Sequence, residues 1–168
     1  YIDVYSLRGK GTVFSVFLPA YGDSGEAAGT LPVVMEEEIS RGRAERVFVG
    51  VDEQFILDFY TDLLSRYGYK VNGFISSVEA MMHFSESSTD YELAIVDQIM
   101  PKIQGDRLAE GLWKVAPELP VILCSGFSGS LGQKEFLRKG FAAFIQKPVN
   151  GELLLQTIRK VLDEKGAG

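Results

Sequence analysis

Four apolar runs in the chain each lead into a polar residue with the chemistry of a phosphate site. The runs and their polar residues are 47–49 with Asp52, 93–96 with Asp97, 121–123 with Ser125, and 141–145 with Lys147. The carboxyl ends of the strands in an open parallel sheet share one edge, where ligands bind. If the runs are strands of one such sheet, two carboxylates, a hydroxyl and an ammonium group meet there. We expect that set to bind a divalent cation and a phosphoryl group side by side.

The sequence from Glu45 onward predicts five alternating strands and helices. The predicted strands are 47–51, 69–74, 93–96, 121–124 and 141–145. The predicted helices are 54–67, 76–84, 107–115, a helix ending at Lys139, and 152–162. Apolar residues recur in the first of these helices at the spacing of an amphipathic helix. Alternating units of this length form a parallel sheet that is covered by helices on both faces.

Composition and charge restrict the possible functions. Of the 168 residues, 46% are hydrophobic and 24% are charged, which is typical of a globular protein with a buried core. The net charge of −6 disfavours binding to nucleic acid. The single cysteine, Cys124, excludes internal disulfides and fits a reducing compartment, and its apolar strand predicts a buried, unreactive thiol. The sequence has no run of about 20 apolar residues, so we expect no membrane contact and a cytoplasmic location.

The first 44 residues differ in character from the rest. Residues 1–19 predict two strands around a turn at Gly9–Thr12, and residues 20–44 predict a linker with a short turn of helix near 33–39. A lone hairpin is marginally stable in water, so this one needs a surface to pack against. The chain opens in a strand pattern without an initiator methionine, which indicates a piece of a longer protein.

Four separate motifs give residues 45–164 a family resemblance. They are Val51-Asp52-Glu53, Val96–Pro101 followed by Gly105, Ser125-Gly126, and Lys147-Pro148. In this order and spacing they resemble the receiver domains of bacterial response regulators. The resemblance implies an α/β fold of the flavodoxin-like (βα)5 type, a doubly wound parallel sheet with strand order 2-1-3-4-5.

The resemblance also implies a role for each residue of the predicted site. Asp97 would accept a phosphoryl group from a phosphohistidine in a Mg²⁺-dependent reaction. The implied Mg²⁺ ligands are Asp52, Asp97 and the backbone carbonyl of Ile99. Lys147 and Ser125 would bind two of the phosphoryl oxygens. The resemblance implies no cofactor other than Mg²⁺.

A conformational switch and a set of partners follow from the same resemblance. Ser125 and Phe144 are the implied switch residues. They would alter the face formed by the helix ending at Lys139, the strand 141–145 and the helix 152–162. The implied partner is a histidine kinase or phosphotransfer domain that carries the phosphohistidine, and a homodimer is a further expectation. His83 is the only histidine and lacks the sequence context of a phosphorylated histidine, so we expect the donor to lie outside this chain.

Residues 1–19 carry a second resemblance, to the last hairpin of a histidine-kinase ATPase domain. It rests on Gly9-Lys10-Gly11-Thr12-x-Phe14 and on Leu18-Pro19. The asparagine and earlier glycine motifs of that ATPase are absent, so this segment does not bind ATP by itself. Together the two resemblances imply a hybrid sensor histidine kinase with a C-terminal receiver domain. The present chain would then catalyse only the phosphorylation and dephosphorylation of its own aspartate.

One departure from the family pattern leaves two functions open. Receiver domains usually carry two adjacent acids after the first strand, whereas this chain has Val51 before Asp52. The loss of a negative charge beside a dication weakens its binding, so we expect a phosphorylation that demands more Mg²⁺. The alternative is a degenerate receiver that acts without phosphorylation, as a protein-protein interaction module.

Two bulky apolar residues, Ile99 and Phe127, flank the expected phosphate position. Neither carries a group that could orient an attacking water, which predicts slow dephosphorylation. Elsewhere, Trp113 and the pair Met81-Met82 are interpreted as packing residues.

Overall fold

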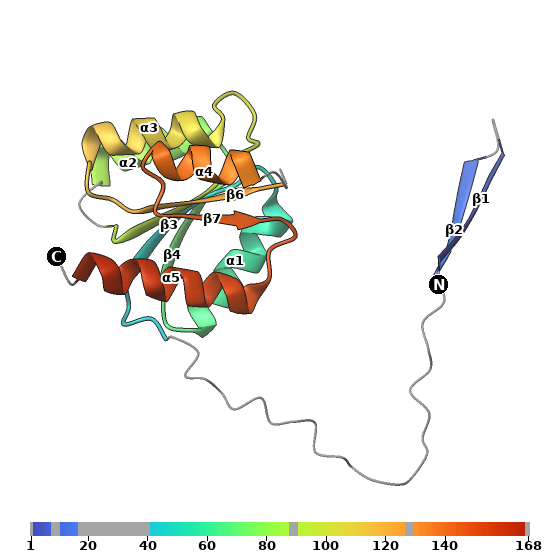
Figure 1. Ribbon diagram of the computed structural model, residues 1–168, viewed down its shortest axis with the longest axis horizontal. Helices are drawn as coiled ribbons and strands as arrows, with labels where there is room; N and C mark the ends of the chain where they lie inside the picture. Colours follow the sequence, from blue (N-terminus) through green and yellow to red (C-terminus); the bar gives the residue numbers. More distant parts are fainter. Residues whose placement is uncertain (1, 8–10, 17–40, 88–90, 127–129, 167–168) are drawn as a thin grey trace, which may run out of the picture. The chain divides into compact units, whose positions relative to one another are not determined.

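The computed structural model describes residues 2–7, 11–16, 41–87, 91–126 and 130–166. The chain divides into two compact units, Tyr1–Glu36 and Glu37–Gly168. In the first unit β1 (Ile2–Leu7) and β2 (Gly11–Val16) pair antiparallel, with Leu7 opposite Gly11 (Figure 1). Two paired strands are therefore present, as predicted, whereas the turn of helix predicted near 33–39 lies outside the described residues.

The second unit is a five-stranded parallel sheet between two layers of helices. Its strands are β3 (Arg46–Gly50), β4 (Lys70–Phe74), β5 (Leu93–Asp97), β6 (Val121–Ser125) and β7 (Ala143–Gln146). Its helices are α1 (Gln54–Arg66), α2 (Ser77–Ser87), α3 (Gly105–Val115), α4 (Ser130–Arg138) and α5 (Gly151–Gly166). None of these five helices has the length and hydrophobicity needed to cross a membrane.

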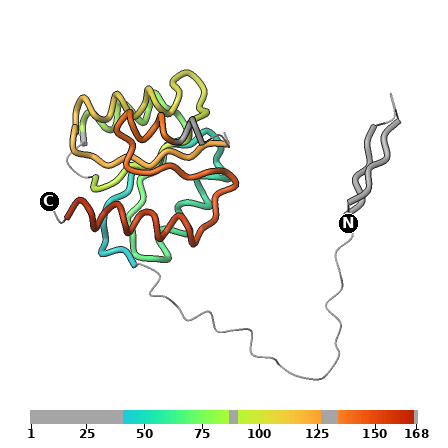
Figure 2. Tube along the Cα trace, in the orientation of Figure 1, coloured from blue at the N-terminus to red at the C-terminus, as the bar shows by residue number. Residues whose placement is uncertain are grey.

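The strand order of this sheet is β4-β3-β5-β6-β7, which is 2-1-3-4-5 when counted within the unit. Figure 1 shows α1 and α5 on one face of the sheet and α2, α3 and α4 on the other. The trace in Figure 2 leaves each strand for a helix before it enters the next parallel strand. The predicted doubly wound flavodoxin-like fold is confirmed.

Each face of the sheet has its own apolar cluster, which explains why the central strands are apolar throughout. Val49 packs in the cluster on the α1 and α5 side, and Phe48 packs in the cluster on the α2 and α3 side. Every residue of β5 and β6 is buried. A strand covered on both faces needs apolar side chains at nearly every position. The polar exceptions, Asp97 and Ser125, are the last residues of their strands, at the carboxyl edge.

Two details of packing differ from the sequence predictions. β7 begins at Ala143 rather than at residue 141, because the N–H of Phe141 still donates to the carbonyl of Phe136 in α4, at 3.4 Å. Met81 packs in the α2 and α3 cluster, but Met82 is 64% exposed, so only the first of this pair is a packing residue.

The second unit begins before its first strand. The N–H of Gly42 donates to the carbonyl of Tyr67 at 2.8 Å. The carboxylate of Glu45 forms an ion pair with Arg159 of α5 at 2.6 Å. Burial opposes the ionisation of Glu45, but the hydrogen bond from Arg159 leaves its pKa lowered overall. These contacts attach residues 42–45 to the helices of the second unit.

The fold predicts a severe effect for Gly105→Ala, at the start of α3. A Cβ atom at this position would lie 2.1 Å from the backbone carbonyl oxygen of Asp97, which a side-chain rotation cannot relieve. We expect the substitution to lower the free energy of unfolding by about 3 kcal/mol, measured by urea denaturation. The matched control is Gly126→Ala, whose Cβ would have no neighbour within 4 Å. Equal stability of the two variants would contradict this account of the loop.

Candidate functional site

Asp97 is a buried carboxylate whose charge is neutralised by a lysine from a neighbouring loop. Its side chain is 2% exposed, and its Oδ2 forms an ion pair with Nζ of Lys147, which follows β7. The N–H of Ile99 donates to Oδ1 at 3.4 Å. A buried carboxylate is tolerated only when it is paired and hydrogen-bonded. Lys147 is itself 32% exposed, so the ion pair has one buried and one partly exposed partner.

Backbone hydrogen bonds hold these groups at one edge of the sheet. The N–H of Gln98 donates to the carbonyl of Cys124 at 2.8 Å, which extends the β5–β6 ladder by one bond beyond Asp97. The N–H of Lys147 donates to the carbonyl of Ser125 at 2.9 Å. Ser125 is fully buried at the end of β6. The structure therefore places Asp97, Ser125 and Lys147 on consecutive strand ends, in the order β5, β6, β7.

Asp52 and Val51 lie on the other side of Asp97, at the end of β3. Gly50 pairs with Val96, so Val51 is the next residue along β3, beside Asp97. Val51 is 1% exposed and belongs to the apolar cluster under α1 and α5. Asp52 is half-buried and precedes Glu53, the N-cap of α1. Within the described part of the chain, the carboxylate of Asp52 has no hydrogen bond or ion pair, and it is available to a ligand.

The oxygen donors at this edge fit Mg²⁺. They carry one negative charge fewer than they would if position 51, next to Asp52, were also an acid. Asp52 and Asp97 supply carboxylate oxygens and Ile99 a backbone carbonyl, and Mg²⁺ prefers oxygen ligands while retaining several waters. Among the described residues no group of three acidic, histidine or cysteine side chains is placed to hold a metal. The structure thus offers two carboxylates, and Val51 occupies the position of a third.

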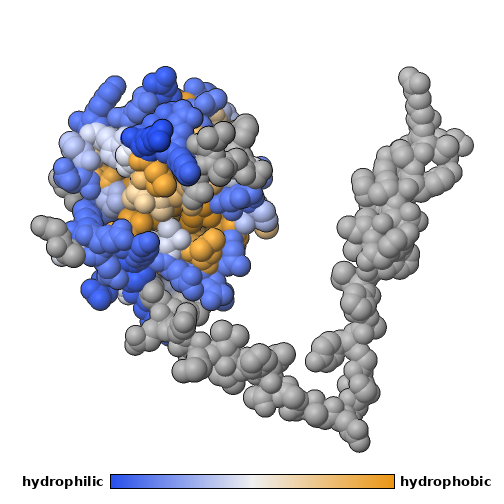
Figure 3. All heavy atoms as spheres, in the orientation of Figure 1, coloured by the Kyte–Doolittle hydropathy of each residue, from blue (hydrophilic) through white to orange (hydrophobic). Residues whose placement is uncertain are grey.

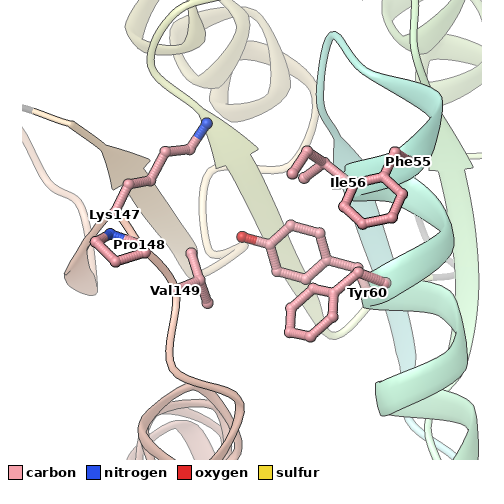
Figure 4. A pocket seen from close by; sticks show the side chains of 7 residues that line it. Phe55, Ile56, Tyr60, Lys147, Pro148 and Val149 are labelled. Atoms are coloured by element: carbon pink, nitrogen blue, oxygen red, sulfur yellow. The ribbon is translucent and has the colours of Figure 1, made fainter. Parts of the chain in front are cut away.

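An apolar pocket of about 250 Å³ opens next to Lys147. Figure 4 shows Lys147, Pro148 and Val149 on one side of it and Phe55, Ile56 and Tyr60 of α1 on the other. Sequence reasoning missed this pocket. The available signal in the sequence was Phe55, an aromatic residue outside the apolar stripe of α1. In the structure its side chain is 77% exposed and lines the pocket.

The remaining predicted residues lie in three different settings. Phe144 is half-buried, and its ring stacks on Phe136 of α4 with centroids 6.2 Å apart. Ile99 is 61% exposed, while Phe127 lies outside the described residues. His83 shares a hydrogen bond with the hydroxyl of Tyr91 at 2.8 Å and is half-buried.

Residues 47–159 match the sequence profile of the response regulator receiver domain. The chain belongs to this family. The chain is also similar to the sensor kinase CckA of Brucella abortus, at 25% identity over 162 residues. That match covers 94% of this chain and 17% of the kinase, so the chain spans about a sixth of the length of this relative.

Solved receiver domains share the fold. A response regulator receiver domain protein from Clostridium thermocellum is 26% identical with a TM-score of 0.69, covering 73% of this chain and 98% of that one. The crystal structure of the CheX–CheY–BeF3–Mg²⁺ complex from Borrelia burgdorferi gives a TM-score of 0.66 at 22% identity, covering 70% of this chain and 88% of that one. At this identity the second likeness shows the fold alone.

The missing acid of this receiver domain predicts a gain of Mg²⁺ affinity in Val51→Asp. A third carboxylate beside Asp52 and Asp97 adds charge attraction for a dication. Without Mg²⁺ the same buried carboxylate is unpaired, so the free energy of unfolding should fall. Ligand binding to the folded state raises stability. We therefore expect a larger Mg²⁺-induced rise in Tm than in the natural chain, measured by calorimetry.

The control for this prediction is Val51→Asn, which introduces a similar shape without a charge. It should lose stability but show the same Mg²⁺-induced shift in Tm as the natural chain. A Val51→Asp variant whose Tm does not respond to Mg²⁺ would show that position 51 is remote from the cation.

Proposed function

We propose that this receiver domain accepts a phosphoryl group from a phosphohistidine onto Asp97. The observation that carries the proposal is the ion pair between Asp97 and Lys147, formed at the carboxyl edge of the sheet next to Ser125. A lysine that neutralises a buried carboxylate in the resting state can bind a phosphoryl oxygen once the carboxylate is phosphorylated. Membership of the receiver family supports the same role.

The proposed step is an in-line transfer between two nucleophiles. An Asp97 carboxylate oxygen forms a bond to phosphorus while the bond from phosphorus to the imidazole nitrogen breaks, and the electron pair stays on the imidazole. Lys147 leaves Asp97 for a phosphoryl oxygen, and Ser125 donates to another. The N–H of Ile99 remains close to the phosphorylated carboxyl group. Such transfers depend on positioning and charge neutralisation more than on covalent chemistry by the protein.

The proposed Mg²⁺ ligands are Asp52, Asp97 and the carbonyl of Ile99. Bound there, Mg²⁺ would supply positive charge to the phosphoryl oxygens and bring them towards the acceptor. The Borrelia complex that contains BeF3 and Mg²⁺ supports this assignment by fold. The half-buried, unpaired carboxylate of Asp52 supports it from this chain.

The proposed partner is a histidine kinase or phosphotransfer domain that docks over α1. Phe55 and Phe59 are 77% and 37% exposed, and both line the pocket beside Lys147. Any protein that brings a phosphohistidine to Asp97 must approach this apolar surface. Burial of this apolar surface by the partner would contribute binding affinity beyond that of the contacts around Asp97.

The proposed context is a hybrid sensor histidine kinase, with residues 1–19 as the end of its ATPase domain and residues 20–44 as a linker. The match to CckA supports it, because that match covers 94% of the chain and so extends beyond the receiver domain proper. The antiparallel pairing of β1 and β2 is consistent with such a hairpin.

The proposed switch alters the face formed by α4, β7 and α5. Figure 3 shows apolar side chains gathering over β7 between these two helices. Leu137 of α4 and Leu153 of α5 are 44% and 51% exposed. Phe144 of β7 stacks on α4, so a change at Ser125 that moves α4 also moves Phe144. A homodimer or an output partner would bind this face.

A second candidate function is a receiver that signals by protein contact alone. The replacement of the first acid by Val51, and the burial of Val51 in the core cluster, favour it. Such a module would use the α1 surface or the α4–β7–α5 face without any phosphoryl transfer.

Phosphorylation with phosphoramidate, a small donor with a P–N bond, distinguishes the two functions. With Mg²⁺ we expect the natural chain to be phosphorylated and Asp97→Asn to remain unlabelled, measured by intact mass. Removal of Mg²⁺ with EDTA should abolish the labelling. The control Asp106→Asn alters a carboxylate that pairs with Lys139 instead, and it should be labelled normally. A natural chain that stays unlabelled at every Mg²⁺ concentration would leave only the interaction module.

The phosphorylated chain should lose its phosphoryl group slowly, over minutes or longer. Ile99 is exposed at the rim of the site and has no polar atom to orient water. Ile99→Asn adds an amide there and should shorten the lifetime of the phosphoaspartate several-fold, followed by intact mass. The control Ile75→Asn changes another exposed isoleucine and should not alter the lifetime. Loss of the phosphoryl group from the natural chain within seconds would refute the prediction.

A further inference from the structure

Two buried polar groups, a hydroxyl and a thiol, lie beneath the acceptor and have no part in the transfer described above. Tyr60 of α1 and Cys124 of β6 are each 1% exposed. The hydroxyl of Tyr60 donates to Sγ of Cys124 at 3.2 Å, across 64 residues of sequence. In Figure 4 the Tyr60 hydroxyl lies between the side chains of α1 and those of the β7–α5 turn, on the side of the pocket nearer to the sheet.

The sheet register places Cys124 next to Asp97. The two residues are direct partners in the β5–β6 pairing, so their side chains project from the same face. That face also carries Ile95, two residues before Asp97, in the cluster that contains Tyr60 and Cys124. The carbonyl of Cys124 accepts the N–H of Gln98 at 2.8 Å, which fixes the backbone just after the acceptor. Cys124 therefore adjoins Asp97 through both its side chain and its backbone.

Stability alone gives little reason for a hydroxyl at position 60. A thiol sulfur is a weak hydrogen-bond acceptor, and a buried hydroxyl with a weak partner regains little of its lost hydration. A phenylalanine would fill the same space in the core without that cost. A group that does not stabilise the fold and lies beside a reactive residue is a candidate for a role in the reaction.

We propose that Tyr60 is a positioning residue for Asp97 and acts through Cys124. The Tyr60 O–H donates to the Cys124 sulfur, which leaves the thiol proton unused. In the resting state Asp97 is bonded to Lys147 and to the N–H of Ile99, so the thiol donates to the carboxyl group only after Lys147 has moved to the phosphoryl group. This donor holds the carboxyl group of Asp97 in its orientation when Lys147 moves to the phosphoryl group. The inference rests on the proposed phosphorylation of Asp97.

The electrostatics of the pair are consistent with this arrangement. Burial is the largest cause of the raised pKa of Tyr60 and of the pKa of about 11 for Cys124. The negative charge of Asp97 adds to both increases. Both groups therefore lie within the field of the acceptor carboxylate.

The test is Tyr60→Phe, phosphorylated by phosphoramidate at saturating Mg²⁺. We expect the rate constant at saturating donor to fall about fivefold, the loss typical of one hydrogen bond, with an unchanged half-saturating donor concentration. The free energy of unfolding should stay the same or rise, because a weakly paired buried hydroxyl is removed. A purely structural role would instead lower stability and leave the rate constant unaltered.

Four further variants complete the experiment. Cys124→Ala should slow the reaction as Tyr60→Phe does, and the double variant should be no slower than Cys124→Ala, because both act through one chain of hydrogen bonds. Cys124→Ser keeps a donor and an acceptor and should retain the natural rate. Tyr91→Phe removes the hydroxyl of another buried tyrosine, bonded to His83 on the opposite face, and should leave the rate unchanged.

The possible outcomes separate this inference from the proposed function. If the natural chain is phosphorylated on Asp97 and Tyr60→Phe matches it in rate, the positioning role is wrong and the proposed function stands. A rate that falls only in proportion to a loss of stability also overturns the role. If the natural chain is not phosphorylated at all, the proposed function fails and the inference fails with it.

Discussion

The burial of one negative charge, on Asp97, sets the arrangement of the whole carboxyl edge. An isolated carboxylate with 2% exposure would be too costly to ionise, and the ammonium group of Lys147 makes it tolerable. The lysine comes from β7, two strands away in the sheet, and β6 with Ser125 lies between them. The ion pair therefore joins the ends of β5 and β7 across the end of β6. Backbone bonds from Gln98 and Lys147 to β6 keep the two charged residues in reach of each other.

Val51 shows how the core and the site compete for one position. It lies beside Asp97 at the end of β3, where an acid would face the cation, yet it packs in the apolar cluster together with Tyr60. Compared with an acid at this position, Val51 extends the hydrophobic core up to Asp97 and removes a charge from the proposed metal site. Because the charge of Asp97 is already paired with that of Lys147, the attraction for a cation comes mainly from Asp52. Whether the domain is a phosphoacceptor or a contact module depends on that balance.

The sequence was sufficient to predict the five strands, their order by family resemblance, and the residues at their ends. Long apolar runs in parallel strands have few alternatives, because both faces of the sheet are covered. The start of β7 was predicted two residues early. The backbone hydrogen bond from Phe141 to α4 delays the strand, and the pattern of apolar side chains does not reveal such a bond. The helical stripe predicted that Tyr60 is buried but not that its hydroxyl meets Cys124. Partners between distant elements depend on packing geometry that periodicity does not encode.

Helix α1 joins the surface that a partner would touch to the residue that would react. Phe59 lies at the exposed edge of the pocket, and its neighbour Tyr60 reaches the sulfur of Cys124 beside Asp97. Because α1 is a rigid element, a partner that shifts Phe59 also shifts the hydroxyl of Tyr60. A small donor binds without touching this surface. The same bond that orients the acceptor would therefore let the acceptor respond to a docked protein, which a hydrogen bond within a single loop could not do.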